Sequence, residues 1–538
     1  MASHQPHRTQ AIPSRLRLTL RIAAWVVVVA VIQGCASLPQ DYPRSDTKAM
    51  TDTDDTRLGT GIAPVVAAHA GDSGFLPLGH GLDAFVARLA LAEAAERTLD
   101  VQYYLFHDDA TGHLLAAYLM RAAERGVRVR LLLDDMDMGG RDAGLAAAAL
   151  HPNIEIRLFN PFPSRSLRFL DLVSHFGTVT RRMHNKSFTA DNQVAVVGGR
   201  NIGDEYFEAA DETNFGDMDV AAVGPIVHAV SGAFDLYWNS SLAYPVEALG
   251  EAGDGERLDA ARTRLAQQVV EMRDSPYARR LRESNLAERL VQKDVTFYWG
   301  PARLLYDLPQ KVSTDPDDQD THMGPQLVDL ISAVDKDLIV VSPYFIPGPK
   351  GTELFRALAA RGVRVTVLTN SLAATDVPAV HAGYARYRRS LVEAGVEVYE
   401  MRPTTAAKSD GKRRLGESQA SLHAKTLVFD LQRVLVGSMN LDPRSYLLNT
   451  EMGILVDSPE LAAKVAEWRT QVLPRIAWRL TLEPAASADA VSGGEPRFVW
   501  TGIDGGQAVR HYGRDPEAAA WARVQAFILS LLPIERQL

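Results

Sequence analysis

Apolar and polar positions follow two alternating periods through most of this chain. Residues 82–97 and 114–125 carry alanine and leucine at helical spacing, whereas residues 99–106 and 127–133 form short apolar runs typical of strands. Gly126 follows the second helical segment, at the position where a left-handed C-cap residue is expected. Strand–helix–strand units of this length predict an α/β fold in which a mostly parallel sheet carries helices on its faces.

The same series of segments returns in the second half of the chain. Residues 338–345 match the first strand, residues 363–369 match the following strand, and Gly362 takes the place of Gly126 between helix and strand. A chain of 538 residues is long enough for two such domains and their cores. The sequence therefore predicts a duplicated α/β domain.

Three segments lie outside this repeat. Residues 36–70 are polar and poor in aromatics, which predicts a flexible tether with order beginning near Ser73. Residues 251–295 are rich in arginine, glutamate and alanine, and they predict a helical connector on the outside of the molecule. Residues 479–538 form a C-terminal extension, in which a strand pair precedes an amphipathic helix at 516–532. That helix is apolar on much of its circumference, which suits packing on the second domain or contact with a membrane surface.

The N-terminal residues resemble a secretory signal. Several arginines precede an apolar run at residues 22–32, which is short for a membrane span but suits the core of a signal peptide. The run leads into Cys35 in a pattern similar to a bacterial lipoprotein box. The resemblance implies that residues 1–35 are a lipoprotein-type signal and that Cys35 is lipidated, with an uncleaved anchor or an ordinary secretory signal as the alternatives. Each alternative places the protein in or beyond a bacterial envelope membrane, and lipidation would anchor its domains outside the cytoplasm.

Composition narrows the choice of partner and of metal chemistry. Lys and Arg total 57 against 66 Asp and Glu, and the resulting formal charge of −9 disfavours nucleic acid as the main partner. Cys35 is the only cysteine, so the chain has no intrachain disulfide and no cysteine-rich metal site. We expect no metal and no cofactor, because the usual clustered histidine–carboxylate ligand sets are also missing from the sequence.

A motif of polar residues stands in each copy of the repeat, at about residues 178–205 and 417–444. Its members are His184, Lys186, Asp191 and Asn201 in the first copy and His423, Lys425, Asp430 and Asn440 in the second. Residues two apart on a strand point to the same face, so each histidine projects beside its lysine. Each aspartate is expected at a hairpin turn, from which a partner strand returns to bring glycine and asparagine near the histidine.

Two such units facing each other would build one phosphate-handling site. Lysines neutralise the non-bridging oxygens of a phosphodiester as charge builds in the transition state. One histidine can attack phosphorus while the other protonates the departing alcohol and then deprotonates the acceptor. Each histidine also needs an acceptor that selects its tautomer. The candidates are Asp217 and Glu451, each downstream of the histidine of its own copy.

With this duplicated motif the chain resembles the phospholipase D superfamily over about residues 73–474. Further stretches, among them residues 199–207 and 440–445, are similar to the bacterial cardiolipin synthase C group. The resemblance implies two duplicated phospholipase D-like α/β/α sandwich domains, at residues 71–250 and 296–478, with one shared active site at their interface.

The resemblance also implies roles for the motif residues. A covalent phosphohistidine intermediate would form on His184, and His423 would act as general acid and base, although the symmetry of the sequence alone does not choose between them. The lysines and asparagines of both motifs would bind the phosphate. Asp191 and Asp430 either take part in catalysis or serve mainly to shape their turns.

The function favoured by these observations is a membrane-associated phosphatidyltransferase that makes cardiolipin from two glycerophospholipids. Its expected partners are phospholipid substrates, the membrane and an activating protein. A phospholipase D that passes the same group to water, giving phosphatidic acid, is the alternative. The negative charge counts against a nuclease of the superfamily, and two intact motifs count against an inactive lipid-binding or scaffolding protein.

Overall fold

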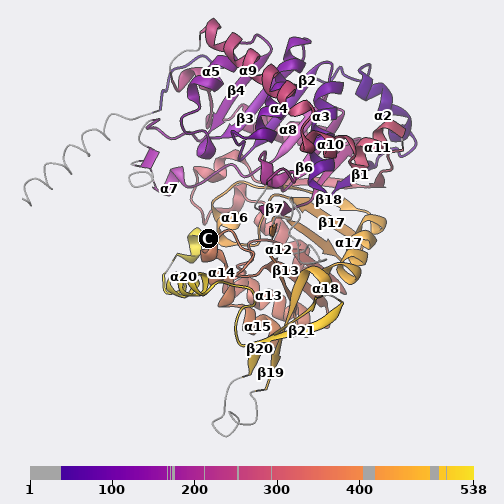
Figure 1. Cartoon of the computed structure of the whole chain (residues 1–538), viewed down its shortest axis with the longest axis vertical. Coiled ribbons are helices and arrows are strands. Elements are labelled where there is room, and N and C mark those ends of the chain that lie inside the picture. The colour runs from indigo at the N-terminus through magenta and orange to yellow at the C-terminus, as the bar shows by residue number, and fades with distance from the viewer. Residues whose placement is uncertain are drawn as a thin grey trace, which may run out of the picture.

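The computed structural model describes residues 38–165, 168–169, 171, 176–210, 213–250, 254–292, 294–403, 419–484, 496–504, 506–532 and 534–538. Two large mixed sheets dominate this part of the chain, one in each half of the sequence. In Figure 1 the first half, in indigo and magenta, lies above the second half, in orange and yellow. The predicted signal at 1–35, with Cys35, lies outside the described residues.

The first sheet collects strands from the N-terminal half. In spatial order they are β10 (Tyr298–Gly300), β1 (Ser73–Leu78), β8 (Asp219–Val223), β6 (Val194–Gly198), β5 (Ser187–Ala190), β2 (Thr98–Tyr103), β3 (Arg128–Asp134), β4 (Ile154–Phe159) and β9 (Ala243–Pro245). The helices of this half are α2 (Arg57–Ala67), α3 (Gly81–Ala94), α4 (Ala110–Glu124), α5 (Asp142–Ala149), α7 (Phe176–Val179) and α8 (Ile226–Trp238).

The second sheet repeats this order and extends it. Its strands are β11 (Ala302–Tyr306), β18 (Met452–Asp457), β17 (Arg433–Gly437), β16 (Thr426–Phe429), β12 (Asp337–Val341), β13 (Arg364–Asn370), β14 (Glu397–Met401), β19 (Ala477–Glu483), β20 (Arg497–Asp504) and β21 (Gln507–Tyr512). Its helices are α12 (Gly324–Ser332), α13 (Gly348–Ala360), α14 (Pro378–Ala385), α15 (Arg388–Glu393), α16 (Pro443–Leu447), α17 (Pro459–Gln471), α18 (Leu473–Ile476) and α20 (Ala520–Ser530).

The prediction of mostly parallel sheets was wrong. Within the described parts of the two large sheets, the parallel neighbours are β2–β3, β3–β4, β12–β13 and β13–β14, which helical crossovers connect. The motif strands instead form hairpins, β5–β6 and β16–β17, and a two-residue turn can only return a strand antiparallel.

Alternate residues of the strands point into different cores, which makes each half a layered sandwich. Val194 and Val196 of β6 belong to the core under α3 and α4, whereas Val197 belongs to the core that α8 covers. This second core continues into the other half, where it includes Val436 and Ile454. The two halves therefore share a hydrophobic core.

The chain before the first sheet is more ordered than expected. Helix α2 occupies much of the predicted tether, and the segment that precedes it docks on the first half. The Arg130 guanidinium donates to the Thr47 carbonyl at 2.9 Å, and the indole N–H of Trp238 donates to the Thr47 hydroxyl at 2.9 Å. Hydrogen bonds hold the part around Thr47, whereas Leu58, Ile62 and Val66 of α2 pack against the core of the first half.

Two further segments lie close to expectation, with shifted limits. The connector forms three helices, α9 (Gly255–Arg273), α10 (Pro276–Arg282) and α11 (Asn285–Gln292), which pack on the outer helices of the first half. Strand β10 still pairs with β1, so the change of sheet falls at Pro301 and not near residue 296. The expected C-terminal strand pair is β20–β21, and it extends the second sheet through β19.

Candidate active site

Both His–Lys pairs lie at the boundary between the two halves. His184 and Lys186 lead into β5, and His423 and Lys425 lead into β16. All four side chains are buried. The four groups share one electrostatic environment, because the charges of Lys425 and His423 act on His184 across the boundary.

Backbone hydrogen bonds join the two motifs reciprocally. The amide of His184 donates to the Thr450 carbonyl at 2.9 Å, and the amide of His423 donates to the Gly216 carbonyl at 2.8 Å. A two-stranded parallel sheet, β7 (Thr213–Gly216) with β15 (Gln419–Leu422), supports the second of these contacts. Each histidine backbone is thus bound to the residue that precedes the other half's carboxylate.

The carboxylates are exchanged between the halves. His184 Nδ1 lies 2.8 Å from Glu451 Oε2, and His423 Nδ1 lies 2.6 Å from Asp217 Oδ2. The sequence singled out these two carboxylates, but we expected each to serve the histidine of its own copy. An ionised carboxylate can only accept, so it favours the tautomer whose Nδ1–H donates to it and whose Nε2 is left as the reactive atom. Lys425 Nζ also lies 2.9 Å from His423 Nδ1.

Burial and the charge of Lys425 lower the pKa of both histidines, although Asp217 opposes this effect on His423, and the two settings differ mainly in their carboxylates. Burial lowers the pKa of His184 well below its usual value, and the charges of Lys186 and Lys425 lower it further. Burial also raises the pKa of Glu451 to about 7. In the second pair, burial works against ionisation of Asp217, but the charge of His423 and its hydrogen bond hold the Asp217 pKa below its usual range. The Asp217 carboxyl group is therefore ionised at neutral pH, whereas the His184 ring is uncharged.

Both lysines lie buried beside the histidines, where burial disfavours their charged form. The Lys186 ammonium donates to the His184 carbonyl at 2.6 Å and lies 5.4 Å from the centre of the Tyr104 ring. The Lys425 ammonium donates to the His423 carbonyl. Burial lowers the pKa of Lys425 to about 8 and lowers the pKa of Lys186 well below its usual value, although the site carboxylates oppose this effect.

The two motif asparagines are not equivalent. Asn201 is engaged at both ends of its amide, since its Oδ1 accepts from the Leu105 amide at 3.2 Å and its Nδ2 donates to the Tyr206 hydroxyl at 2.9 Å. The buried Oδ1 of Asn440 has no hydrogen-bond partner among the described residues. The side-chain amide of Asn440 is therefore more available to a ligand than that of Asn201.

The motif aspartates lie at the hairpin turns between β5 and β6 and between β16 and β17, where the sequence predicted them. Asp191 and Asp430 both have positive φ, at 50° and 52°. The Asp191 carboxylate accepts from the amides of Glu96, Arg97 and Thr98, and the Asp430 carboxylate makes the equivalent set of bonds in the second half. These contacts tie the turn to the chain before β2 and β12. They favour a structural role over a catalytic one.

Other contacts at the site had no clear signal in the sequence. The Ser438 hydroxyl donates to Glu451 Oε2 at 2.5 Å, and the Glu451 amide donates to Asp307 Oδ2 at 2.7 Å. Ser438 belongs to the small pair that precedes Asn440, so its place in the motif was the available hint. At position 199 of the first copy, only glycine fits without a clash, because a Cβ there would lie 2.2 Å from Asp217 Oδ1.

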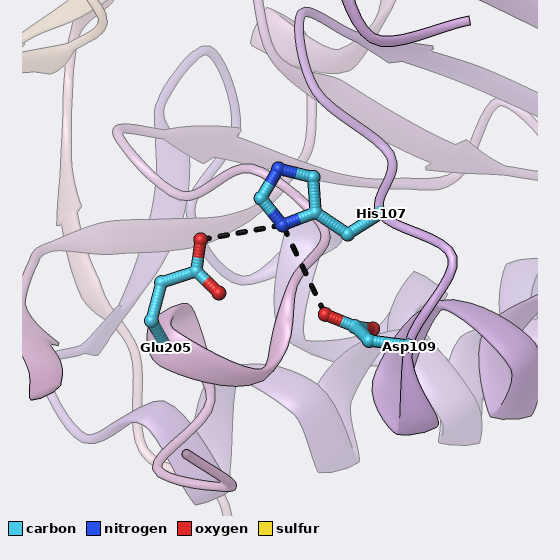
Figure 2. Close-up of side chains that lie close together, drawn as sticks. All are labelled: His107, Asp109 and Glu205. Atoms are coloured by element: carbon cyan, nitrogen blue, oxygen red, sulfur yellow. Dashed lines mark ion pairs between the residues drawn. The ribbon is translucent and has the colours of Figure 1, made fainter. Parts of the chain in front are cut away.

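A second polar cluster lies beside the first motif. Figure 2 shows the His107 ring between two carboxylates, with Nδ1 3.3 Å from Glu205 Oε1 and 3.9 Å from Asp109 Oδ2. Among the described residues, the side chains of His107, Asp109 and Glu205 lie close enough together to hold a metal ion. Both Asp109 oxygens are already engaged, because they accept from the amides of Gly112 and Asp204. The contacts identify the cluster as an ion-paired clamp between the loop after β2 and the loop that carries Asn201.

Comparison with known proteins decides the family. A family model described as "Cardiolipin synthase, PLD-like domain" matches residues 89–238 and 327–473, one segment in each half and together more than half of the chain. The chain belongs to this phospholipase D-like family. The predicted superfamily and the duplicated phospholipase D-like fold are thereby confirmed.

Members of this phospholipase D-like family match most of the chain. It is 40% identical to cardiolipin synthase C of Escherichia coli (strain K12) over 481 residues, which cover 89% of this chain and 99% of that protein. It is 27% identical to a cardiolipin synthase of Staphylococcus aureus (strain Mu50) over 374 residues, 68% of this chain and 60% of that one. The phosphatidylserine synthase structure from Haemophilus influenzae Rd KW20 shares the fold, with a TM-score of 0.51 at 14% identity, over 74% of this chain and 86% of that chain.

Proposed function

We propose that this protein is a membrane-associated phosphatidyltransferase that makes cardiolipin from two glycerophospholipids. The observation that carries the proposal is the reciprocal pair of buried histidines, each bound to a carboxylate of the other half and flanked by a buried lysine. Two imidazoles with opposite tasks and two cations suit transfer of a phosphodiester group. The similarity to cardiolipin synthases supplies the substrate class.

The first half-reaction transfers the phosphatidyl group to the enzyme. His184 Nε2 attacks phosphorus, the bond between phosphorus and the headgroup oxygen breaks, and His423 gives its Nε2 proton to the departing alcohol. Lys186 and Lys425 neutralise the two non-bridging oxygens, and the amide of Asn440 donates to one of them. The products are a phosphatidyl group bound to His184 Nε2 through a phosphorus–nitrogen bond and a free alcohol.

The second half-reaction restores the enzyme. His423, now neutral, takes the proton from a hydroxyl of the acceptor lipid, whose oxygen attacks phosphorus while the bond to His184 Nε2 breaks. Asp217 stabilises the imidazolium that forms on His423. The neutral state of His184 and the ionised state of Asp217 both support this division of roles.

Membrane attachment is part of the proposal. Cys35 and the apolar run before it support a lipid anchor, with the two domains outside the cytoplasm. Within the residues that the structure describes, none of the helices has the length and apolar character needed to cross a bilayer. The lipid anchor predicts that fatty acids label the wild type and do not label Cys35→Ser. The anchor is contradicted if the wild type is also unlabelled and Cys35→Ser stays fully membrane-bound.

Product analysis tests the function. The protein is incubated with phosphatidylglycerol vesicles, and with mixed phosphatidylglycerol and phosphatidylethanolamine vesicles, before the lipids are identified by mass spectrometry. We expect cardiolipin, and its loss in His184→Ala and His423→Ala, whereas His228→Ala, an exposed histidine on α8, should match the wild type. Phosphatidic acid as the sole product would assign the phospholipase D alternative. Running the assay also in envelope membranes shows whether an activating protein increases the rate.

A further inference from the structure

Helix α20 near the C-terminus presents a row of large apolar side chains to solvent. None of its residues is buried, and Trp521, Phe527 and Leu531 are 70%, 65% and 69% exposed. The exposed set also includes Val524, Ile528 and Leu532. The amphipathic helix predicted from the sequence thus packs on α14 by one side and leaves the rest of its apolar surface uncovered.

This exposure is unusual for a surface helix. Positions 521, 524, 528 and 531 follow the three- and four-residue steps of one helical face. A contiguous apolar face of this kind marks a site of interaction, because scattered apolar residues rarely form such a row on a monomer. Bulky aromatic residues within it are typical of helices that lie in a membrane interface.

The apolar face lies close to the catalytic site. After α20 the chain ends in a short helical turn, η6 (Glu535–Gln537), where the Leu538 carbonyl accepts from the Arg444 amide at 2.9 Å. The Arg444 side chain donates to the Thr180 carbonyl in the other half, and its charge lowers the pKa of His184. Figure 1 shows α20 and α7 on the same side of the molecule, below and above the boundary between the halves.

Charges around the face suit an anionic partner. The carboxylates next to the helix are neutralised within the fold, Glu535 by Arg386 at 3.0 Å and Asp515 by Arg388 at 2.8 Å. The helix itself carries Arg523 and no acidic residue. The local surface is therefore apolar with one cationic side chain on the helix, Arg523, because Arg386 and Arg388 are offset by their own carboxylates.

We propose that α20 is a membrane-docking helix, which lies in the surface of an anionic glycerophospholipid bilayer with Trp521, Phe527 and Leu531 among the acyl chains. The docked helix holds the boundary between the halves, and with it the catalytic site, against the lipid surface. Delivery of substrate by this contact rests on the proposed function, whereas the contact itself does not. A partner protein or a second copy of the chain is less suitable, because an exposed row of large aromatic and aliphatic side chains with one arginine and no acidic residue is typical of helices that lie in a membrane interface.

Tryptophan quenching tests the contact without any need for turnover. The full chain is bound to phosphatidylglycerol and phosphatidylethanolamine vesicles whose acyl chains carry bromine, and quenching of its emission is compared with that of Trp521→Phe. We expect the quenching to fall in Trp521→Phe and to persist in Trp468→Phe, which removes a half-buried tryptophan of α17. Equal quenching in the wild type and in Trp521→Phe would overturn the proposal. So would shielding of Trp521 from acrylamide before vesicles are added, because another protein surface would then cover the face.

A kinetic comparison tests the consequence for substrate delivery. We expect the double variant Phe527→Gln/Leu531→Gln to raise the KM for vesicle lipid at least about tenfold, because two apolar side chains no longer enter the bilayer. Turnover of a water-soluble chromogenic phosphodiester should stay at the wild-type level. Val270→Gln/Val291→Gln, two exposed apolar residues of the connector, is the matched control and should leave both values unchanged. Unchanged KM in the α20 variant overturns the delivery role, while absence of cardiolipin in every sample would contradict only the proposed function.

Discussion

His184 Nδ1 and Glu451 Oε2 lie 2.8 Å apart, although the two residues belong to different halves of the duplicated fold. The reciprocal contact, between His423 and Asp217, is 2.6 Å long. Neither half alone therefore contains a histidine together with its carboxylate partner. We expect the duplication to be functional only when the halves are docked, and the shared hydrophobic core and the paired strands β7 and β15 hold them together.

The exchanged carboxylates should be essential for turnover. We expect Asp217→Asn to lower kcat by about 10²- to 10⁴-fold, because His423 loses the anion that stabilises its protonated form during proton transfer. Glu451→Gln should lower kcat as well, since it replaces the carboxylate that orients His184 with a neutral amide, one end of which donates instead of accepting. Asp337→Asn, which breaks a buried ion pair with Arg469 away from the site, is the matched control. Near-normal kcat in both site variants would show that the cross-half contacts do not serve catalysis.

The charge of Lys425 predicts a pH limit on substrate capture. Because burial lowers the Lys425 pKa to about 8, the ammonium is charged below this pH and is lost above it. We expect kcat/KM for the phospholipid to fall as pH rises through about 8. Lys425→Arg keeps its charge at higher pH and should move this limb upward, at a lower maximal rate. A limb that stays at the same pH in the arginine variant assigns the titration to another group.

The motif aspartates should act on stability more than on rate. Asp191→Asn replaces a carboxylate that accepts from three backbone amides with a neutral amide. Because these hydrogen bonds are weakened, we expect the free energy of unfolding to fall by about 1–3 kcal/mol. Urea unfolding measures this change, and kcat of the folded variant should stay within a few-fold of wild type. Collapse of kcat with an unchanged unfolding midpoint would restore a catalytic role for Asp191.

The His107 clamp predicts a pH-dependent contribution to stability. The hydrogen bond to Glu205 raises the pKa of His107 above its usual value, although burial opposes this. A group whose pKa is raised on folding adds stability that is fully present below about pH 6.5 and is lost as pH rises through the folded-state pKa. The Tm difference between wild type and His107→Gln should therefore be larger at pH 6 than at pH 8.5, with His228→Gln as control. A difference that is constant or grows with pH contradicts the ion-pair interpretation.

Periodicity and repetition were enough to predict the duplicated fold, the hairpin turns at Asp191 and Asp430, and the clustering of the two His–Lys pairs. They could not predict which carboxylate meets which histidine. Glu451 follows His423 in sequence, yet a contact across the halves depends on docking geometry that symmetric sequence copies do not encode. Pairing within one copy and pairing across the two copies are equally compatible with the spacing of the motif.

Other features escaped the sequence for different physical reasons. The segment around Thr47 is polar because hydrogen bonds to Arg130 and Trp238 hold it, so its composition resembles that of a tether. The hairpins themselves were predicted, but the helix–strand alternation did not reveal that they place antiparallel strands beside β2 and β12 in the middle of each sheet. For α20, periodicity predicted an apolar face, but only the fold shows that this face remains exposed.

The most direct test of the central claim is to locate the covalent intermediate. The enzyme is mixed with phosphatidylglycerol, quenched in alkali during turnover, digested and examined by peptide mass spectrometry. We predict a phosphatidyl adduct on the peptide that contains His184, and none in His184→Ala. An adduct on the His423 peptide would contradict the assigned roles, and turnover without an adduct on either histidine would contradict the two-histidine mechanism itself.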